Sequence, residues 1–276
     1  MVTLTRRQIL DLMDQYGIRP SRALGQNFVT DQNTVRKIAH LAKIGPGDHV
    51  IEIGGGLGSL TLALAETGAS ITTVEIDKYV LPALRLVAEP QGVRVVEADV
   101  MSIDWNDLLG DSDSWVLAGN LPYNIATPIV TNILDFVPKI GRMVLMAQRE
   151  VVDRMVAGVG DAAYGAVSVK VAYWARAKFL GAVPPTVFVP RPKIDSALLS
   201  IERRADPVFS EADVDREIFF ELVRAGFAHR RKTLRNALEG LVSPATFDQA
   251  GISPSARAEE LDVQAWGRLA ICKMAP

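Results

Sequence analysis

The sequence predicts an α/β protein with a mainly parallel sheet, followed by a smaller all-helical domain at the C-terminus. From residue 48 onward, short β-rich runs alternate with helical segments, which is typical of βαβ units. A glycine-rich turn follows the first of these runs directly. Beyond about residue 205 the β-rich runs stop and only helical periodicity continues. We therefore expect one domain over residues 1–205 and a second over 206–276.

Composition sets limits on the class of protein. The chain has 276 residues, of which 49% are hydrophobic and 22% charged, enough for one large core and a smaller one. No apolar run has the length of a signal peptide or a membrane span, so we expect a cytoplasmic protein without membrane contact. The single Cys272 excludes an internal disulfide, and three scattered histidines give no support to a metal site. The net charge of −2 does not by itself indicate a nucleic-acid partner.

The N-terminal segment precedes the β-rich region. Residues 5–16 have the apolar spacing of an amphipathic helix that stops at Gly17. Residues 19–29 are polar, basic and rich in turn formers, which is typical either of a loop that covers a ligand or of a solvated linker. Asp31 is then placed to cap the next helix.

The predicted sheet uses seven β-rich runs. We expect strands over residues 49–53, 70–75, 93–97, 115–118 and 142–146, and a hairpin formed by 176–183 and 197–201. The connector inside that hairpin, residues 183–193, contains four prolines, which exclude a helix or a central strand.

The last part of the chain shows helical periodicity over residues 215–228, 230–241 and 263–273. Positive charge is concentrated here, because six basic residues between 216 and 235 face only two acidic ones. Such a local patch is a candidate surface for phosphate groups, although a charged segment is more often a solvated face.

The glycine-rich turn suggests a cofactor site. Residues 54–58 contain four glycines and open a helix, so a ligand can approach the backbone there. Ser59 stands where a dinucleotide fingerprint requires its third glycine, whereas the spacing from Glu52 to Gly58 fits Glu-x-Gly-x-Gly-x-Gly.

Three polar side chains follow the next predicted strands. Glu75 ends the second strand, and Asp99 and Asn120 come just after the third and fourth. Because the carboxyl ends of parallel strands meet along one crevice, we expect these residues to converge there. Glu75 is then placed to accept both ribose hydroxyls of a nucleoside, and Asp99 to accept from its adenine amine. The alternative is a set of separate, solvated loop acids.

The stretch Asn120-Leu-Pro-Tyr123 suits a purine amine. The Asn120 side-chain oxygen accepts from an N–H, and the residue before a proline favours extended backbone, which turns the carbonyls between them outward. Tyr123 adds a flat face for a base. The alternative is a simple Asn-x-Pro turn between a strand and a helix.

Taken in order, these motifs resemble those of the N6-adenine methyltransferases, a Rossmann-like class that uses S-adenosylmethionine. The flanking sequence resembles the small-subunit ribosomal RNA adenine dimethyltransferase family (KsgA/RsmA) over nearly the whole chain. The resemblance is carried by residues 24–28, 50–54, 74–77, 120–128, 188–197 and 227–236. The family usually has a proline where this chain has Gly55, so we expect a looser turn, with an effect on cofactor affinity.

The resemblance implies an activity and a set of cofactor contacts. The implied reaction is N6,N6-dimethylation of two adjacent adenosines in the 3′-terminal hairpin of 16S rRNA, during biogenesis of the 30S subunit, by a monomer. The residues expected to contact S-adenosylmethionine are Asn27, Val29, Gly54, Gly56, Glu75, Asp99 and Asn120.

For the target base we expect flipping into the site and stacking between Tyr123 and Phe188, although Phe188 is as well suited to core packing of the connector. The Asn120 side-chain oxygen and the Pro122 carbonyl would accept from the N6 amine and aim its lone pair at the methyl group. We assign no general base.

For RNA binding we expect phosphate contacts from both domains. The candidate residues are Arg22, Arg191, Lys193, Arg230, Arg231, Lys232 and Arg235. The competing interpretations are a 23S rRNA adenine methyltransferase of antibiotic resistance, a ribosome-assembly or transcription-factor-like binding protein without turnover, and a DNA or small-molecule adenine methyltransferase.

Overall fold

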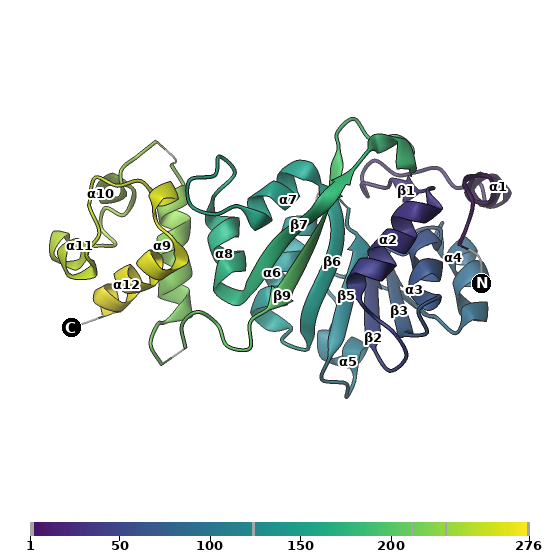
Figure 1. Cartoon of the computed structure of the whole chain (residues 1–276), viewed down its shortest axis with the longest axis horizontal. Coiled ribbons are helices and arrows are strands. Elements are labelled where there is room, and N and C mark those ends of the chain that lie inside the picture. Colours follow the sequence, from purple (N-terminus) through teal and green to yellow (C-terminus); the bar gives the residue numbers. More distant parts are fainter. Residues whose placement is uncertain (1–2, 123–124, 211, 230, 275–276) are drawn as a thin grey trace. The chain divides into compact units, whose positions relative to one another are not determined.

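The computed structural model describes residues 3–122, 125–210, 212–229 and 231–274 (Figure 1). The chain forms two compact units, which are described separately. The first comprises Met1–Val152 and Lys178–Glu202, and the second Asp153–Ala177 and Arg203–Pro276. The domain change expected at 205/206 thus falls near Arg203, but residues 153–177 go with the helical unit instead of the sheet.

The sheet confirms the predicted α/β class. Its strand order is β4-β3-β2-β5-β6-β9-β7, in which β2 to β6 pair in parallel and β9 is antiparallel to β6. The strands are β2 (His49–Ile53), β3 (Ser70–Glu75), β4 (Arg94–Glu97), β5 (Trp115–Asn120), β6 (Ile140–Gln148), β7 (Ala175–Val183) and β9 (Ser196–Arg203). Because β-branched and apolar runs marked each strand, the sequence placed all seven to within two residues.

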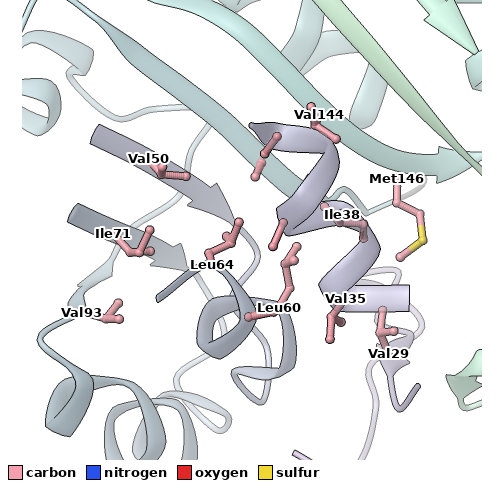
Figure 2. Packing of buried hydrophobic residues seen from close by; sticks show 14 of the residues in the cluster. Val29, Val35, Ile38, Val50, Leu60, Leu64, Ile71, Val93, Val144 and Met146 are labelled. Atoms are coloured by element: carbon pink, nitrogen blue, oxygen red, sulfur yellow. The ribbon is translucent and has the colours of Figure 1, made fainter. Parts of the chain in front are cut away.

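Helices alternate with these strands. Those of the first unit are α1 (Arg6–Gln15), α2 (Gln32–Ala42), α3 (Ser59–Ala65), α4 (Leu81–Ala88), η1 (Glu89–Gln91), α5 (Trp105–Leu109) and α6 (Ala126–Phe136), with α7 (Arg149–Val156) following β6. Asp31 caps α2 as predicted, because its carboxylate accepts the Thr34 N–H at 2.7 Å. The apolar side chains of α2 and α3 pack on the central strands, as Val35, Ile38 and Leu60 show in Figure 2.

A second, two-stranded sheet was not predicted. β1 (Phe28–Val29) pairs antiparallel with β8 (Phe188–Val189), which follows η2 (Pro185–Val187) in the proline-rich connector. The Thr30 N–H extends this pairing by donating to the Val187 carbonyl at 2.7 Å. The N-terminal loop is therefore hydrogen-bonded to a segment more than 150 residues further along the chain.

The second unit has its own helical core. It contains α8 (Ala166–Trp174), α9 (Arg216–Phe227), α10 (Leu234–Ala237), α11 (Pro244–Ala250), η3 (Ala258–Glu260) and α12 (Val263–Met274). Tyr173 of α8 and Phe219 of α9 lie in one buried cluster with Trp266 of α12, which explains why residues 153–177 join this unit. No helix in the part of the chain that the structure describes is long and apolar enough to cross a membrane.

One helix prediction was wrong. The segment 230–241 was expected to be a helix, but only α10 is helical there. Thr233 instead forms an isolated bridge with Arg257, and the Leu234 N–H donates to the Ala256 carbonyl at 2.7 Å. Pairing with a distant segment therefore replaces the first turn of the expected helix.

Candidate functional site

A deep hollow lies at the carboxyl ends of the parallel strands in the first unit. Its volume is about 1240 Å³ including the open mouth. We call residues 24–29 the lid loop and residues 54–58 the glycine loop; both line the hollow. Further lining residues are Glu52, Ile53, Ser59, Leu60, Val74, Glu75, Ile76, Ala98, Asp99, Val100, Met101, Asn120, Leu121, Pro122 and Ile125. The predicted convergence of strand ends is thus observed.

The glycine loop is closely packed. Gly56 has a φ of 53°, and a Cβ there would lie 3.1 Å from the Phe28 ring of the lid loop. Below Gly55, a Cβ would lie 2.8 Å from Leu84 Cδ2 and would also overlap the Thr73 hydroxyl. Neighbouring side chains thus fill the space that a larger residue would need at this position. The looser turn expected at Gly55 stays a prediction.

Glu75 lies beside this loop, at the end of β3. Its side chain is buried, and its Oε2 accepts the Gly56 N–H at 2.8 Å while Oε1 accepts the N–H groups of Ile76 and Asp77, both at 2.9 Å. Burial raises the pKa of Glu75, and the three backbone hydrogen bonds act in the opposite direction. A carboxylate has about four acceptor positions, so one remains for a ligand hydroxyl where two ribose bonds were expected.

Glu52 is a second buried carboxyl at the bottom of the hollow. Its exposed fraction is 1%, and the Thr61 hydroxyl donates to its Oε2 at 2.5 Å. Burial raises the pKa of Glu52 to about 7, against the opposing effect of the Thr61 hydrogen bond. Its position under the glycine loop suits a structural carboxyl better than a ligand contact.

Two apolar side chains were missed from the sequence. Ile76 and Met101 line the hollow although 49% and 48% of their surfaces are exposed. Asp99 lies between them in the chain, and its Oδ1 accepts the Met101 N–H at 2.9 Å, so the carboxylate keeps its second oxygen open. The sequence did contain one indication of this, because the apolar Ile76 directly follows Glu75 at the end of a predicted strand. We call Glu75, the glycine loop, Ile76, Asp99 and Met101 the cofactor end of the hollow.

We call residues 120–122 the target end. Asn120 Nδ2 donates to the Asn27 carbonyl of the lid loop at 3.0 Å, and no group of the described residues donates to its Oδ1, which is an acceptor position. The Pro122 carbonyl accepts the N–H groups of Ile125 and Ala126 at 3.2 and 3.1 Å.

The Pro122 expectation therefore has to be corrected. Both lone pairs of its carbonyl are used, because Pro122 begins the turn that leads into α6. Among the described residues nothing donates to the neighbouring Leu121 carbonyl, so that oxygen is the acceptor available beside Asn120.

Tyr123 and Phe188 were expected to stack on the target base, and the structure bears on only one of these two expectations. Tyr123 lies outside the described residues. Phe188 is 1% exposed and packs in the same buried cluster as Val29 and Val35, and it is absent from the lining of the hollow. The core-packing alternative therefore holds for Phe188, because β8 pairs with β1 and presents that ring to the interior.

The lid loop is fixed at several points. Gln26 Nε2 donates to Asp77 Oδ2 at 2.7 Å, just beyond β3, and its Oε1 accepts the Ser21 N–H at 2.8 Å. Asn27 and Val29, both expected to contact a cofactor, line the hollow. The loop is thus held over the cofactor end by side-chain bonds that were not predicted.

The expected RNA contacts are surface residues. Arg22, Arg191 and Lys193 are exposed in the first unit, and Arg231, Lys232 and Arg235 in the second, whereas Arg230 lies outside the described residues. Arg231 and Lys232 belong to the turn before α10 instead of a helix. Their phosphate contacts stay a prediction.

The family model and the relatives that match this chain all have names that describe methylation of ribosomal RNA. Residues 19–274 match the family model described as ribosomal RNA adenine dimethylase. A protein of Kineococcus radiotolerans named ribosomal RNA small subunit methyltransferase A is 44% identical over 97% of this chain and 90% of its own length. A protein of the same name from Cutibacterium acnes is 43% identical over 94% of this chain and 91% of its own length.

Solved structures share the fold. A dimethyladenosine transferase from Plasmodium falciparum has a TM-score of 0.75 at 23% identity, covering 88% of this chain and 95% of its own. The 23S rRNA methyltransferase ErmE has a TM-score of 0.71 at 26% identity, covering 89% of this chain and 99% of its own.

Proposed function

Because the chain belongs to the ribosomal RNA adenine dimethylase family, we propose that it transfers methyl groups from S-adenosylmethionine to the N6 atoms of two adjacent adenosines in the 3′-terminal hairpin of 16S rRNA. The observation that carries this proposal is the target end, where the Asn120 Oδ1 and the Leu121 carbonyl are two acceptors next to the cofactor end. Family and fold imply a methyl donor, and the lining of the hollow supports this particular one.

The cofactor end suits a nucleoside. The remaining acceptor position of Glu75 would take a ribose hydroxyl, and the open oxygen of Asp99 would take the adenine amine. The exposed Ile76 and Met101 would cover the faces of the purine ring, removing their apolar surface from water. Backbone N–H groups of the glycine loop would meet the amino-acid part of the cofactor.

The target end would prepare the amine for attack. Two N6–H groups donating to Asn120 and Leu121 would favour a pyramidal nitrogen whose lone pair points at the cofactor. When bound, S-adenosylmethionine supplies a methyl group on a sulfonium, which already carries its leaving group. On accepting that methyl group the adenosine nitrogen would release one proton to water, and the donor's sulfur would leave as a neutral thioether. Positioning therefore supplies most of the catalysis, and we assign no general base.

We propose the small ribosomal subunit or its precursor as the substrate particle, and a monomer as the active form. Relatives 40–44% identical to this chain are named for the small subunit. Phosphate contacts from Arg22, Arg191, Lys193 and the segment around Arg231 would dock the RNA.

Methyl transfer to ribosomal particles tests the proposal. The protein is incubated with labelled S-adenosylmethionine and either unmethylated 30S subunits or naked 23S rRNA, and the label is mapped. We expect label on two adjacent adenosines near the 3′ end of 16S rRNA only. Label on 23S rRNA would support the activity that the name of the ErmE neighbour describes, and no label on either RNA would favour a binding protein without turnover.

A further inference from the structure

Helix α2 carries charge of one sign. Its exposed charged or ionisable residues are Arg36, Lys37 and His40, followed by Lys43 at its C-cap, and we call these four the α2 basic face. The helix contains no acidic residue, whereas α1 and α9 each contain both acidic and basic residues. The opposite side of α2 is buried in the core (Figure 2), so the basic face is the outer side of this helix.

Most of this face lacks acidic partners. Arg36 forms an ion pair with Glu66 at 3.6 Å. Among the described residues, Lys37, His40 and Lys43 have no ion pair with an acidic side chain. A surface lysine without a paired carboxylate keeps its full charge available for a ligand anion.

Lys43 has an unusual backbone. With φ 49° and ψ 51° it is the only non-glycine residue of the described ranges in the left-handed region. Helices usually end in this conformation with glycine, because a Cβ costs free energy there. Arg142 Nη2 donates to the Lys43 carbonyl at 3.1 Å and holds the turn in place. Lys43 therefore keeps an exposed positive charge at the end of α2 at a free-energy cost in its backbone.

The face is also hollowed. A shallow groove between α2 and α3 is lined by Arg36, His40 and Lys43 together with Glu66 and Thr67. Lys37 extends toward β7, since its Nζ lies 3.3 Å from the place that a Cβ on Gly181 would occupy. The face lies on the later half of α2, and Lys43 lies beside Arg142 near the start of β6, toward the amino ends of the strands and away from the hollow.

We propose that the α2 basic face binds the sugar–phosphate backbone of the substrate RNA, outside the segment that delivers the target adenosine to the hollow. This inference rests on the proposed function, because it names a second contact for the same RNA. Unpaired lysines gain free energy from phosphates by releasing counterions, and such contacts set the position of an RNA without reading its sequence. The face therefore positions the substrate and takes no part in the chemistry.

A charge-matched pair of variants tests this. Lys37→Gln with Lys43→Gln removes two charges from the face, and Arg7→Gln with Arg94→Gln removes two exposed charges elsewhere in the same unit. The dissociation constant for unmethylated 30S subunits is measured over a series of salt concentrations. We expect binding to weaken about tenfold in the first variant, with the salt slope reduced by about 1.4 to 1.8 for two lost phosphate contacts. The control variant should keep the wild-type slope.

Lys43→Gly separates this role from a structural one. Glycine relieves the left-handed strain, so the melting temperature should rise or stay the same while RNA binding weakens. A Lys43 that served only to end the helix would give unchanged RNA binding. Equal salt slopes in the double variant and its control would overturn the inference. Failure of the proposed function would show differently, as a wild-type protein that binds the particle without methylating it.

Discussion

At the cofactor end of the hollow, three backbone N–H groups hold the Glu75 carboxylate, whereas at the target end a single side-chain amide connects Asn120 to the lid loop. The first arrangement is buried and made largely of main chain. The second depends on the Asn27 carbonyl, which belongs to a loop that is itself fixed by Gln26 and by β1. The difference supports a preformed site for the nucleoside that we propose to bind there, and a proposed site for the target amine that is completed only when the lid loop is in place.

The largest expected effect on ligand binding is at Glu75. Glu75→Gln replaces a charged acceptor of three N–H groups with an amide that can accept through one oxygen, so we expect S-adenosylmethionine to bind about 100-fold more weakly. Calorimetry measures this directly. Asp99→Asn is the matched control, because Asp99 is exposed and holds only one N–H, and its loss should be about tenfold or less. Equal losses in both variants would contradict a preformed, buried cofactor end.

Glu52 should give the cofactor end a pH-dependent stability. Its folded-state pKa of about 7 is above the ordinary 4.5, so the folded state holds the proton more tightly than the unfolded state. The free energy of unfolding should therefore fall as pH rises from about 4.5 to about 7, and Glu52 should account for about 3 kcal/mol of this decrease. The difference between wild type and Glu52→Gln in urea titrations isolates it. A difference that is flat across this range would mean that Glu52 is not buried as described.

A smaller effect is expected under the glycine loop. Gly55→Ala would place a Cβ 2.8 Å from Leu84 Cδ2, so we expect a loss of about 1–3 kcal/mol in the free energy of unfolding. Gly45→Ala is the control, because nothing lies within 4 Å of a Cβ there, and its change should stay within about 0.5 kcal/mol. In a double-mutant cycle, Gly55→Ala should cost less in the Leu84→Ala background than in the wild type, although Leu84→Ala is itself destabilising because Leu84 is fully buried. An unchanged stability for Gly55→Ala would show that the loop has room after all.

The smallest effect concerns the lid loop. Gln26→Ala removes the hydrogen bond to Asp77, which we expect to speed S-adenosylmethionine dissociation about fivefold, consistent with about 1 kcal/mol for one such bond. Stopped-flow displacement measures the rate. The exposed Gln91, outside the lid loop, provides the control Gln91→Ala, with no expected change. If both variants dissociate like wild type, the lid loop does not retain the cofactor through Gln26.

The sequence alone was sufficient to predict those features that depend on local residue patterns, such as the positions of the strands. Alternating apolar runs located the strands, and because strand order in such sheets brings carboxyl ends together, Glu75, Asp99 and Asn120 were correctly placed around one hollow. The family resemblance was confirmed by the match over residues 19–274.

What the sequence could not supply depends on distant contacts. Whether the Pro122 or the Leu121 carbonyl is free depends on the turn into α6, and the burial of Phe188 depends on its pairing with β1. The fit of Gly55 depends on Leu84, almost thirty residues later. Neither the composition nor the hydrophobic periodicity of the sequence indicates which distant residues contact one another.

The central claim is that the Asn120 side-chain oxygen positions the adenine amine. Single-turnover methyl transfer to unmethylated 30S subunits, at saturating S-adenosylmethionine, tests it with two variants. Asn120→Ala removes the acceptor and the donor to Asn27, whereas Asn120→Asp keeps an acceptor and loses the donor. We expect Asn120→Ala to slow the chemical step by about 10³-fold, with Asn120→Asp less affected and cofactor binding changed only a few-fold in both. Wild-type turnover in Asn120→Ala with intact cofactor binding would contradict the claim.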